Sequence, residues 1–176
     1  MNQTALSAFL CSMKKFTRPL LYALAALLLL AQLYRPERNL SNDQTHHISL
    51  KYPTPDEVNT ILEIACNDCH SNQTRYPWYA NIQPIASWLA NHVNEAKREL
   101  NFSTFTKRKI AVQNHKFEEI IEMVEEGNMP LGSYTWVHRD AALTEAQKQT
   151  LTQWAKACMD TLQAQYPADS LVLQRK

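Results

Sequence analysis

The chain has 176 residues, of which 45% are hydrophobic and 20% are charged, and this balance excludes an intrinsically disordered protein. The formal net charge of +1 argues against a nucleic-acid-binding protein, which needs a basic surface. The charge is uneven, because residues 1–38 carry a net charge of +4 and the rest of the chain carries −3. Only two glycines occur, so Gly-rich loops that bind phosphate are also excluded.

Residues 1–34 are predicted to form an N-terminal membrane anchor. The basic stretch KKFTR precedes an apolar run at positions 19–34, which Gln32 alone interrupts. This run is shorter than the roughly 20 residues of a typical transmembrane helix and longer than the roughly 7–15 residues of a signal-peptide core. No small-residue cleavage site follows it, which favours an uncleaved signal anchor. The alternatives are a cleaved signal peptide, which would release a soluble periplasmic form, and a buried helix.

The charges around this run predict its orientation. Lys14, Lys15 and Arg18 precede the apolar residues, and positive charges in this position stay on the cytoplasmic side. We therefore expect the N-terminus in the cytoplasm and the rest of the chain at the periplasmic face of the inner membrane. Met13 is an alternative translation start, in which case Cys11 would not belong to the protein.

The remaining sequence divides into a polar tether at residues 35–53, a domain at residues 54–165 and a C-terminal tail at residues 166–176. No stretch alternates polar and apolar residues for long enough to indicate a strand, so the expected fold class is all-α. Helices are expected after four start signals, each followed by apolar residues at helical spacing. The signals are a capping box at Thr54 and Glu57, Pro84, Asn114 as a cap with Gly127 as the stop, and a capping box at Thr144 and Gln147.

The apolar residues of these helices define the predicted core. Trp88 and Trp154 are the largest of them, and both are expected between packed helices. The full set is Val58, Ile61, Leu62, Ala65, Ile85, Trp88, Leu89, His92, Val93, Ala96, Phe117, Ile120, Ile121, Val124, Leu151, Trp154, Ala155, Cys158 and Leu162.

The pentapeptide CNDCH contains Cys66, Cys69 and His70, and several kinds of chemistry use such a Cys-x-x-Cys pair. A structural zinc ion needs two further ligands, but the only other cysteine after the anchor is Cys158, on an apolar helix face. A thioredoxin-like redox pair needs a βαβ context, which an all-α chain lacks. A plain disulfide is a further alternative, because the chain is predicted to be exported.

Covalent haem agrees with the most features. Cys-x-x-Cys-His is the attachment signature of c-type cytochromes. The two thiols bond to the vinyl groups of the porphyrin, and the histidine becomes the proximal iron ligand. Attachment takes place outside the cytoplasm, in agreement with the predicted export. We therefore predict one covalent haem c, bound by Cys66 and Cys69 with His70 as proximal ligand, in a small cytochrome c-like helical domain.

Met129 is the predicted distal ligand of the haem iron. It lies in the loop GNMPL after the helix stop, and Pro130 stiffens that loop. A thioether is a frequent sixth ligand in electron carriers. Met123 faces away from the apolar stripe of its helix and is therefore less suitable. His138 is the main alternative, and an iron without a sixth protein ligand is another.

Five further residues are candidates for the haem environment. Arg75, Tyr76 and Trp78 follow the proximal histidine, and Tyr134 and Trp136 follow the predicted distal ligand. The aromatic side chains are expected to cover the porphyrin, and the arginine is expected to pair with a haem propionate. The alternative is ordinary aromatic packing and a surface arginine.

The segments CNDCHSNQTRYPWYANIQP, ELNFS and GNMPLGSYTWVHRDAALTEAQKQTLTQWA occur in this order, and RPERN follows the predicted anchor. In these segments the chain resembles the small membrane-anchored haem-binding domain family of bacterial monohaem cytochromes c, from about Arg35 to Ala157. The resemblance implies an exported, mostly helical domain with the same covalent haem, the same proximal histidine and a loop methionine at Met129. It implies no particular substrate or partner.

The expected function is the transfer of single electrons at the outer face of the inner membrane, without enzymatic turnover. The expected partners are the membrane and periplasmic or membrane-bound redox proteins. Two alternatives keep the haem: a sensor that binds a diatomic gas, and a weak peroxidase-like activity that uses His138 and Arg139 as its acid–base pair. A third alternative is an exported helical module without haem, stabilised by a disulfide or zinc.

Overall fold

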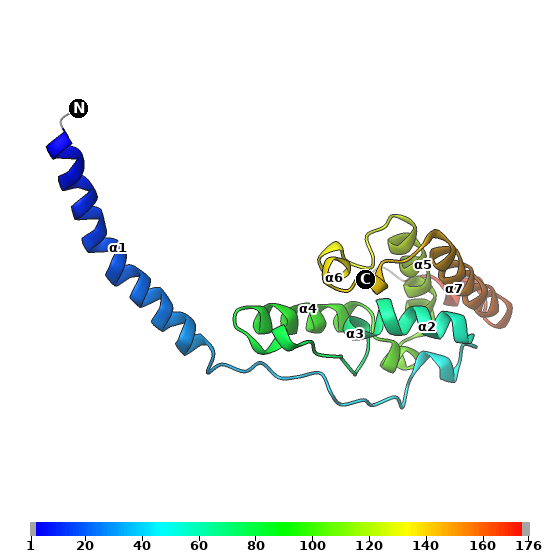
Figure 1. Cartoon of the computed structure of the whole chain (residues 1–176). Helices are drawn as coiled ribbons and strands as arrows, with labels where there is room; N and C mark the ends of the chain where they lie inside the picture. Colours follow the sequence, from blue (N-terminus) through cyan, green and yellow to red (C-terminus); the bar gives the residue numbers. More distant parts are fainter. Residues whose placement is uncertain (1–2, 174–176) are drawn as a thin grey trace. The chain divides into compact units, whose positions relative to one another are not determined.

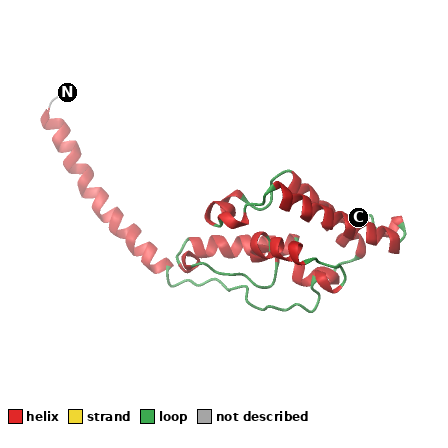
Figure 2. Cartoon of the chain, turned by 45° about the vertical axis from the view of Figure 1, so that its right-hand side comes forward, coloured by secondary structure: helices red, strands yellow, loops and turns green. Residues whose placement is uncertain are grey.

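The computed structural model describes residues 3–173, with side chains from Thr17 onward. Helices make up all of the regular secondary structure of these residues (Figure 2), which confirms the predicted all-α fold class. The chain divides into two compact units. The first comprises Met1–Glu37 and Tyr76–Ala90, and the second comprises Arg38–Arg75 and Asn91–Lys176.

The first unit contains the long helix α1 and the segment that leads into α4. Helix α1 spans Gln3–Ala31, η2 spans Trp78–Asn81, and α4 spans Ile85–Glu99 and continues into the second unit (Figure 1). Among the helices whose side chains the structure describes, none has the length and hydropathy of a transmembrane span. The predicted orientation signals Lys14 and Lys15, with Cys11 and Met13, lie outside the described side chains. The anchor therefore stays a prediction.

The core of the second unit lies between α2, α5 and α7. Helix α2 spans Asp56–Ala65, α5 spans Ile110–Glu125 and α7 spans Glu145–Gln165, while η1 (Ile48–Leu50) and η3 (Phe102–Lys107) also contribute to the core. Helices α5 and α7 pack along each other, and α2 packs on α7 (Figure 1). The predicted burial of these three helices is confirmed for Val58, Ile61, Leu62, Ala65, Phe117, Ile120, Val124, Leu151, Trp154, Ala155, Cys158 and Leu162. Further short helices are α3 (Asn67–His70), α6 (Gly132–Val137), η4 (Arg139–Ala141) and η5 (Ala168–Ser170).

Two of the predicted helix ends are confirmed. The Thr144 hydroxyl oxygen accepts a hydrogen bond from the backbone N–H of Gln147. The Gln147 side-chain oxygen accepts one from the backbone N–H of Thr144, and the two bonds form the capping box of α7. Gly127 has a φ of +73° directly after the last residues of α5, a conformation that glycine adopts without a steric penalty. This turn ends α5 and directs the chain into the loop that contains Met129.

Two predicted helix starts are wrong. Helix α2 begins at Asp56 after an extended Pro55, because the Thr54 hydroxyl donates to the carbonyl of Tyr52 (3.0 Å) and does not cap the helix. Helix α5 begins at Ile110, which places Asn114 inside the helix and not at its cap. The earlier start adds one turn, residues 110–113, before the predicted helix.

The boundaries of the packed unit also differ from those predicted. Ile48 and Tyr52, placed in the polar tether, are fully buried in the core. The Tyr52 hydroxyl donates to Gln113 Oε1 at 2.6 Å, which gives this buried polar pair its partner. Leu171, placed in the C-terminal tail, is buried in the same core. Isolated apolar residues in a polar stretch carry no periodicity, so the sequence did not reveal them.

The predicted apolar face of α4 is only partly right. Val93 is buried, but Ile85 and Trp88 are exposed, so the prediction that Trp88 packs between helices is wrong. The buried positions in the first half of the helix are Ala86 and Ala90. The helix therefore buries its small residues and leaves its large ones on the surface.

Candidate functional site

One pocket of the second unit brings together five of the predicted site residues: Cys66, Cys69, His70, Met129 and Tyr134. It has a volume of about 400 Å³, within the range of about 300–1,000 Å³ that small-molecule and cofactor sites occupy. Its walls come from α2, α3, the second half of α4, α5 and the loop between α5 and α6. The wall is mainly apolar, so the pocket suits a large apolar group better than a polar substrate.

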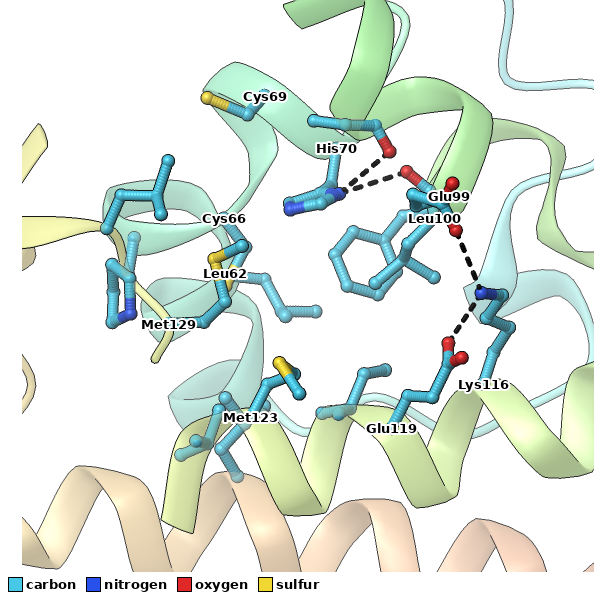
Figure 3. Close-up of a pocket in the computed structure, with 18 of the residues that line it drawn as sticks. Leu62, Cys66, Cys69, His70, Glu99, Leu100, Lys116, Glu119, Met123 and Met129 are labelled. Atoms are coloured by element: carbon cyan, nitrogen blue, oxygen red, sulfur yellow. Dashed lines mark hydrogen bonds and ion pairs between the residues drawn. The ribbon is translucent and has the colours of Figure 1, made fainter. Parts of the chain in front are cut away.

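Both cysteines of CNDCH lie in the wall of this pocket. Cys66 ends α2, and Cys69 lies one turn further on in α3, so the helical backbone turns both thiols to the same side (Figure 3). Neither forms a disulfide. Burial raises the pKa of the Cys66 thiol to about 12 and that of Cys69 to about 11. Both are therefore protonated thiols at neutral pH.

The ring of His70 is held by the end of α4. Its Nδ1 lies 3.2 Å from the carbonyl oxygen of Ala96 and 3.0 Å from that of Leu100. Because a carbonyl oxygen only accepts, Nδ1 carries the proton and Nε2 keeps its lone pair. Figure 3 shows Nε2 directed into the pocket. Burial lowers the pKa of His70, so its neutral, ligating form is favoured.

The residues after His70 are fixed by the segment ELNFS. The backbone N–H of Asn72 donates to the hydroxyl of Ser103 (3.0 Å), and the Asn101 amide donates to the side-chain oxygen of Asn72 (2.9 Å). Phe102, between them, is buried, and its ring makes a T-shaped contact with the ring of His70 at a centroid distance of 6.4 Å. The segment ELNFS thus contacts both the ring of His70 and the backbone that follows it, which is a physical reason for the residues of this segment.

Asp68, between the two cysteines, joins the thiol-bearing turn to α6. Its carboxylate accepts hydrogen bonds from the Tyr134 hydroxyl (2.8 Å), from Arg75 Nε (3.0 Å) and from the Arg75 backbone N–H (3.0 Å). Asp68 is buried, so these bonds offset the cost of removing its charge from water. Asp68 was not among the residues predicted from the sequence. The sequence signal for the pair of Asp68 and Arg75 is an acidic residue inside CNDCH with an arginine seven positions later.

Two methionines, not one, point into the pocket opposite His70. Met129 comes from the loop after Gly127, and Met123 comes from the last turns of α5 (Figure 3). The backbone N–H of Met129 donates to the carbonyl of Met123 at 3.0 Å, which ties the loop to the helix. The prediction that Met123 is unsuited to the site is wrong, because the pocket lies on the side of α5 that carries Lys116, Glu119 and Met123, next to the apolar stripe.

His138, the alternative distal ligand, does not line the pocket. Its ring stacks on Tyr134 at a centroid distance of 4.3 Å and an angle of 26°, and its Nδ1 lies 3.3 Å from the Tyr134 carbonyl. The geometry therefore brings the methionines, and not His138, to the pocket.

The α4–α5 edge of the pocket is charged. Lys116 is a buried cation that contacts the carboxylates of Glu119 and Glu99, the latter at 3.6 Å. His115 lies 3.2 Å from the other oxygen of Glu119. All four residues line the pocket. These residues were not predicted, because the sequence does not show that this side of α5 borders the pocket and meets the end of α4.

Only one of the five residues predicted to surround the haem lines the pocket. Tyr134 lines the pocket. Trp136 is exposed and does not line it. Arg75 pairs with Asp68 and with the carbonyl of Glu63 (2.8 Å), and it does not line the pocket either. Tyr76 and Trp78 belong to the first unit, so their place near a haem stays a prediction.

These residues fit a haem. The pocket presents two thiols, a histidine with its ligating nitrogen directed inward, and a thioether, on an apolar wall with a cation at one edge. In the part of the chain with described side chains, no three His, Cys, Asp or Glu side chains gather as a metal-binding group. The fold and the pocket thus define a small helical haem-binding domain.

The comparison with protein families agrees with this class. A model described as the haem-binding domain matches residues 26–157, and the chain belongs to that family. No match was found among curated proteins. No solved structure matches either.

Proposed function

We propose that this protein carries single electrons through one haem c bound in the pocket of the second unit. The observation that supports it best is the ring of His70, which the carbonyls of Ala96 and Leu100 hold with Nε2 directed at the pocket. When bound, the haem supplies an iron that exchanges one electron between its ferric and ferrous states. His70 is the proximal ligand in this proposal.

Cys66 and Cys69 attach the group. Each thiol adds its S–H across one vinyl double bond, so that a carbon–sulfur bond forms and the hydrogen goes to the neighbouring carbon. This addition needs no oxidant or reductant. Their place in the wall of one pocket, without a disulfide between them, supports this role.

Met129 is the proposed distal ligand. It lines the pocket on a loop that Gly127 and the bond to Met123 hold in place. A methionine ligand raises the reduction potential and keeps gases from the iron, which favours a carrier over a gas sensor. Lys116 is the cation best placed in the wall for a propionate group, a role for which Arg75 was predicted.

The proposed location is the inner membrane, with the N-terminus in the cytoplasm, the apolar run in the bilayer and the second unit at the periplasmic face. The uneven charge of the chain and the apolar run at positions 19–34 support it. Anchoring keeps the carrier near membrane-bound redox proteins, its proposed partners, and so raises its effective concentration there.

The test is a reduced pyridine haemochrome spectrum of protein produced with cytochrome c maturation machinery. The protein is first denatured and extracted with acid acetone, which removes haem that is not covalently bound. We expect a c-type spectrum with one haem per chain. A Cys66→Ala, Cys69→Ala double variant is the control and should retain no haem after extraction. A wild-type chain without haem would overturn the proposal.

Carbon monoxide distinguishes the carrier from the sensor. The native ferrous protein at neutral pH should show no change in its spectrum with carbon monoxide, because the thioether occupies the sixth position. Rapid and complete binding would instead support the gas-binding alternative.

A further inference from the structure

The segment Tyr76–Ala90 of the first unit has an unusual surface. Its sequence, YPWYANIQPIASWLA, contains no charged residue. Trp78 is 75% exposed, Trp88 is 51% exposed, and Ile82 and Ile85 are each about 40% exposed. Large apolar side chains exposed in a segment without charges are typical of an interaction site. We call these four residues the interfacial patch.

Hydrogen bonds attach this segment to the residues that directly follow α1. The Gln83 backbone N–H donates to Gln32 Oε1 (2.9 Å), and Gln32 Nε2 donates to the Gln83 carbonyl (3.2 Å). Gln83 Nε2 donates to the Tyr34 carbonyl (3.0 Å), and the Arg35 guanidinium donates to the Asn81 carbonyl. Gln83 is buried by these contacts. The patch is therefore held at the C-terminal end of α1.

The described part of helix α1 presents apolar side chains on all sides from Pro19 to Ala31. Each residue from Thr17 to Ala31 is exposed, and so are Leu33 and Tyr34 beyond the helix. A helix that is apolar all round requires an apolar environment. In the proposed orientation, the apolar run ends at Tyr34, and the chain enters the headgroup region there. The segment bonded to this end of the run then lies at the same level.

We propose that the interfacial patch rests in the boundary between headgroups and acyl chains of the bilayer that holds α1. This inference depends on the anchor in the proposed function. Trp is the residue most suited to this layer, because its large ring is apolar while its N–H remains hydrated. The absence of charge in the segment removes the main cost of contact with lipid. The occupant of this surface is thus lipid.

The experiment uses the full-length, haem-loaded protein in proteoliposomes of phosphatidylethanolamine and phosphatidylglycerol. A photoreactive benzoylphenylalanine replaces one residue at a time: Trp78 in the patch, Leu24 in α1, or Gln153 on the exposed side of α7. Leu24 reports on the anchor, and Gln153 is the control for an exposed residue outside the first unit. After irradiation, mass spectrometry identifies lipid and protein adducts, and the haem spectrum checks the fold of each variant.

We expect lipid adducts at positions 24 and 78, with a yield at position 78 at least about tenfold above that at position 153. Adducts at position 24 with none at 78 would overturn the inference and leave the anchor intact. No adduct at position 24 would overturn the anchor and the inference together, whereas the haem spectrum tests the haem site independently. An adduct at position 78 only with a second copy of the chain would replace lipid by self-association and overturn the inference.

Discussion

At the residue scale, the pocket contains two methionines, and each is a possible ligand of a haem iron. Met129 lies on a loop, and Met123 lies on a helix, yet both point to the same space. A loop can move its side chain toward the iron more easily than the last turns of α5 can, because residues in α5 are held by packing against α7. This supports Met129 as the proposed distal ligand and a packing role for Met123.

Substitution of each methionine tests this assignment. Met129→Ala is expected to abolish the near-infrared charge-transfer band of methionine-ligated ferric haem, to lower the reduction potential and to open the ferrous iron to carbon monoxide. Met123→Ala is the matched control, since it removes the same group from the same pocket, and it should keep the band. Loss of the band in Met123→Ala alone would exchange the two roles. The measurements are near-infrared absorption and a redox titration.

Cys158 gives a prediction on pH. Its thiol is buried in α7, and burial raises its pKa to about 12. At pH 7 the reactive thiolate is then only about 10⁻⁵ of the population. Iodoacetamide should leave Cys158 unmodified in the native protein and label it fully after denaturation, as peptide mass spectrometry can show. Because the thiolate is the reactive form, labelling must rise with pH. Rapid labelling of native protein at pH 7 would contradict the assigned burial.

The site residues that could be predicted from the sequence are those whose role is indicated by a short local motif. Cys66, Cys69 and His70 are adjacent in the chain, and Met129 follows a recognisable helix stop. Asp68 and Lys116 were not found, because their roles depend on partners 66 residues away, at Tyr134, or on the neighbouring helix, at Glu99. Neither the composition nor the local spacing of residues indicates contacts between positions that are far apart in the chain.

At the scale of elements, the bond between Asp68 and Tyr134 connects α3 to α6 (2.8 Å). It is the point where the turn that bears the thiols meets the helix that follows Met129. Loss of this bond would free α6 and with it the loop of the distal ligand. The bond is therefore a candidate for controlling how firmly Met129 is held.

Tyr134→Phe removes the hydroxyl and keeps the ring that stacks on His138. We expect a loss of about 1–3 kcal/mol in the free energy of unfolding, since a buried carboxylate loses a donor. We also expect faster binding of cyanide to the ferric iron, because the loop opens more often. Guanidinium titration and stopped-flow absorption give the two values. Trp136→Phe, on the exposed side of the same helix, should change stability by less than about 0.5 kcal/mol. Equal effects in both variants would contradict this role.

Helix ends illustrate what local sequence can and cannot predict. Thr144 and Gln147 form the expected capping box because their partners are each other. Thr54 has the same residue type, but its hydroxyl finds the carbonyl of Tyr52, a residue assigned to the tether. Tyr52 is fixed in turn by the core and by Gln113. Capping signals are thus reliable where no tertiary contact competes for the side chain.

At the scale of the whole molecule, the pocket and the predicted membrane anchor belong to different parts of the chain. All the residues that line the pocket belong to the second unit, whereas the apolar helix and the interfacial patch belong to the first. The same division appears in the charge, which is basic in residues 1–38 and acidic in the remainder. Binding of the haem and attachment to the membrane are therefore expected to be separable.

Replacement of residues 1–34 by a cleavable export signal tests this separation. The released chain should appear in the periplasmic fraction with one covalent haem and an unchanged near-infrared band, because no residue of the pocket is altered. Gln83 loses its partners Gln32 and Tyr34, so amide hydrogen exchange should become faster in residues 76–90 and stay unchanged in α5 and α7. Pyridine haemochrome and exchange mass spectrometry of both forms provide the comparison. A released chain that is exported and folded but has lost its haem band would mean that the first unit also shapes the haem site.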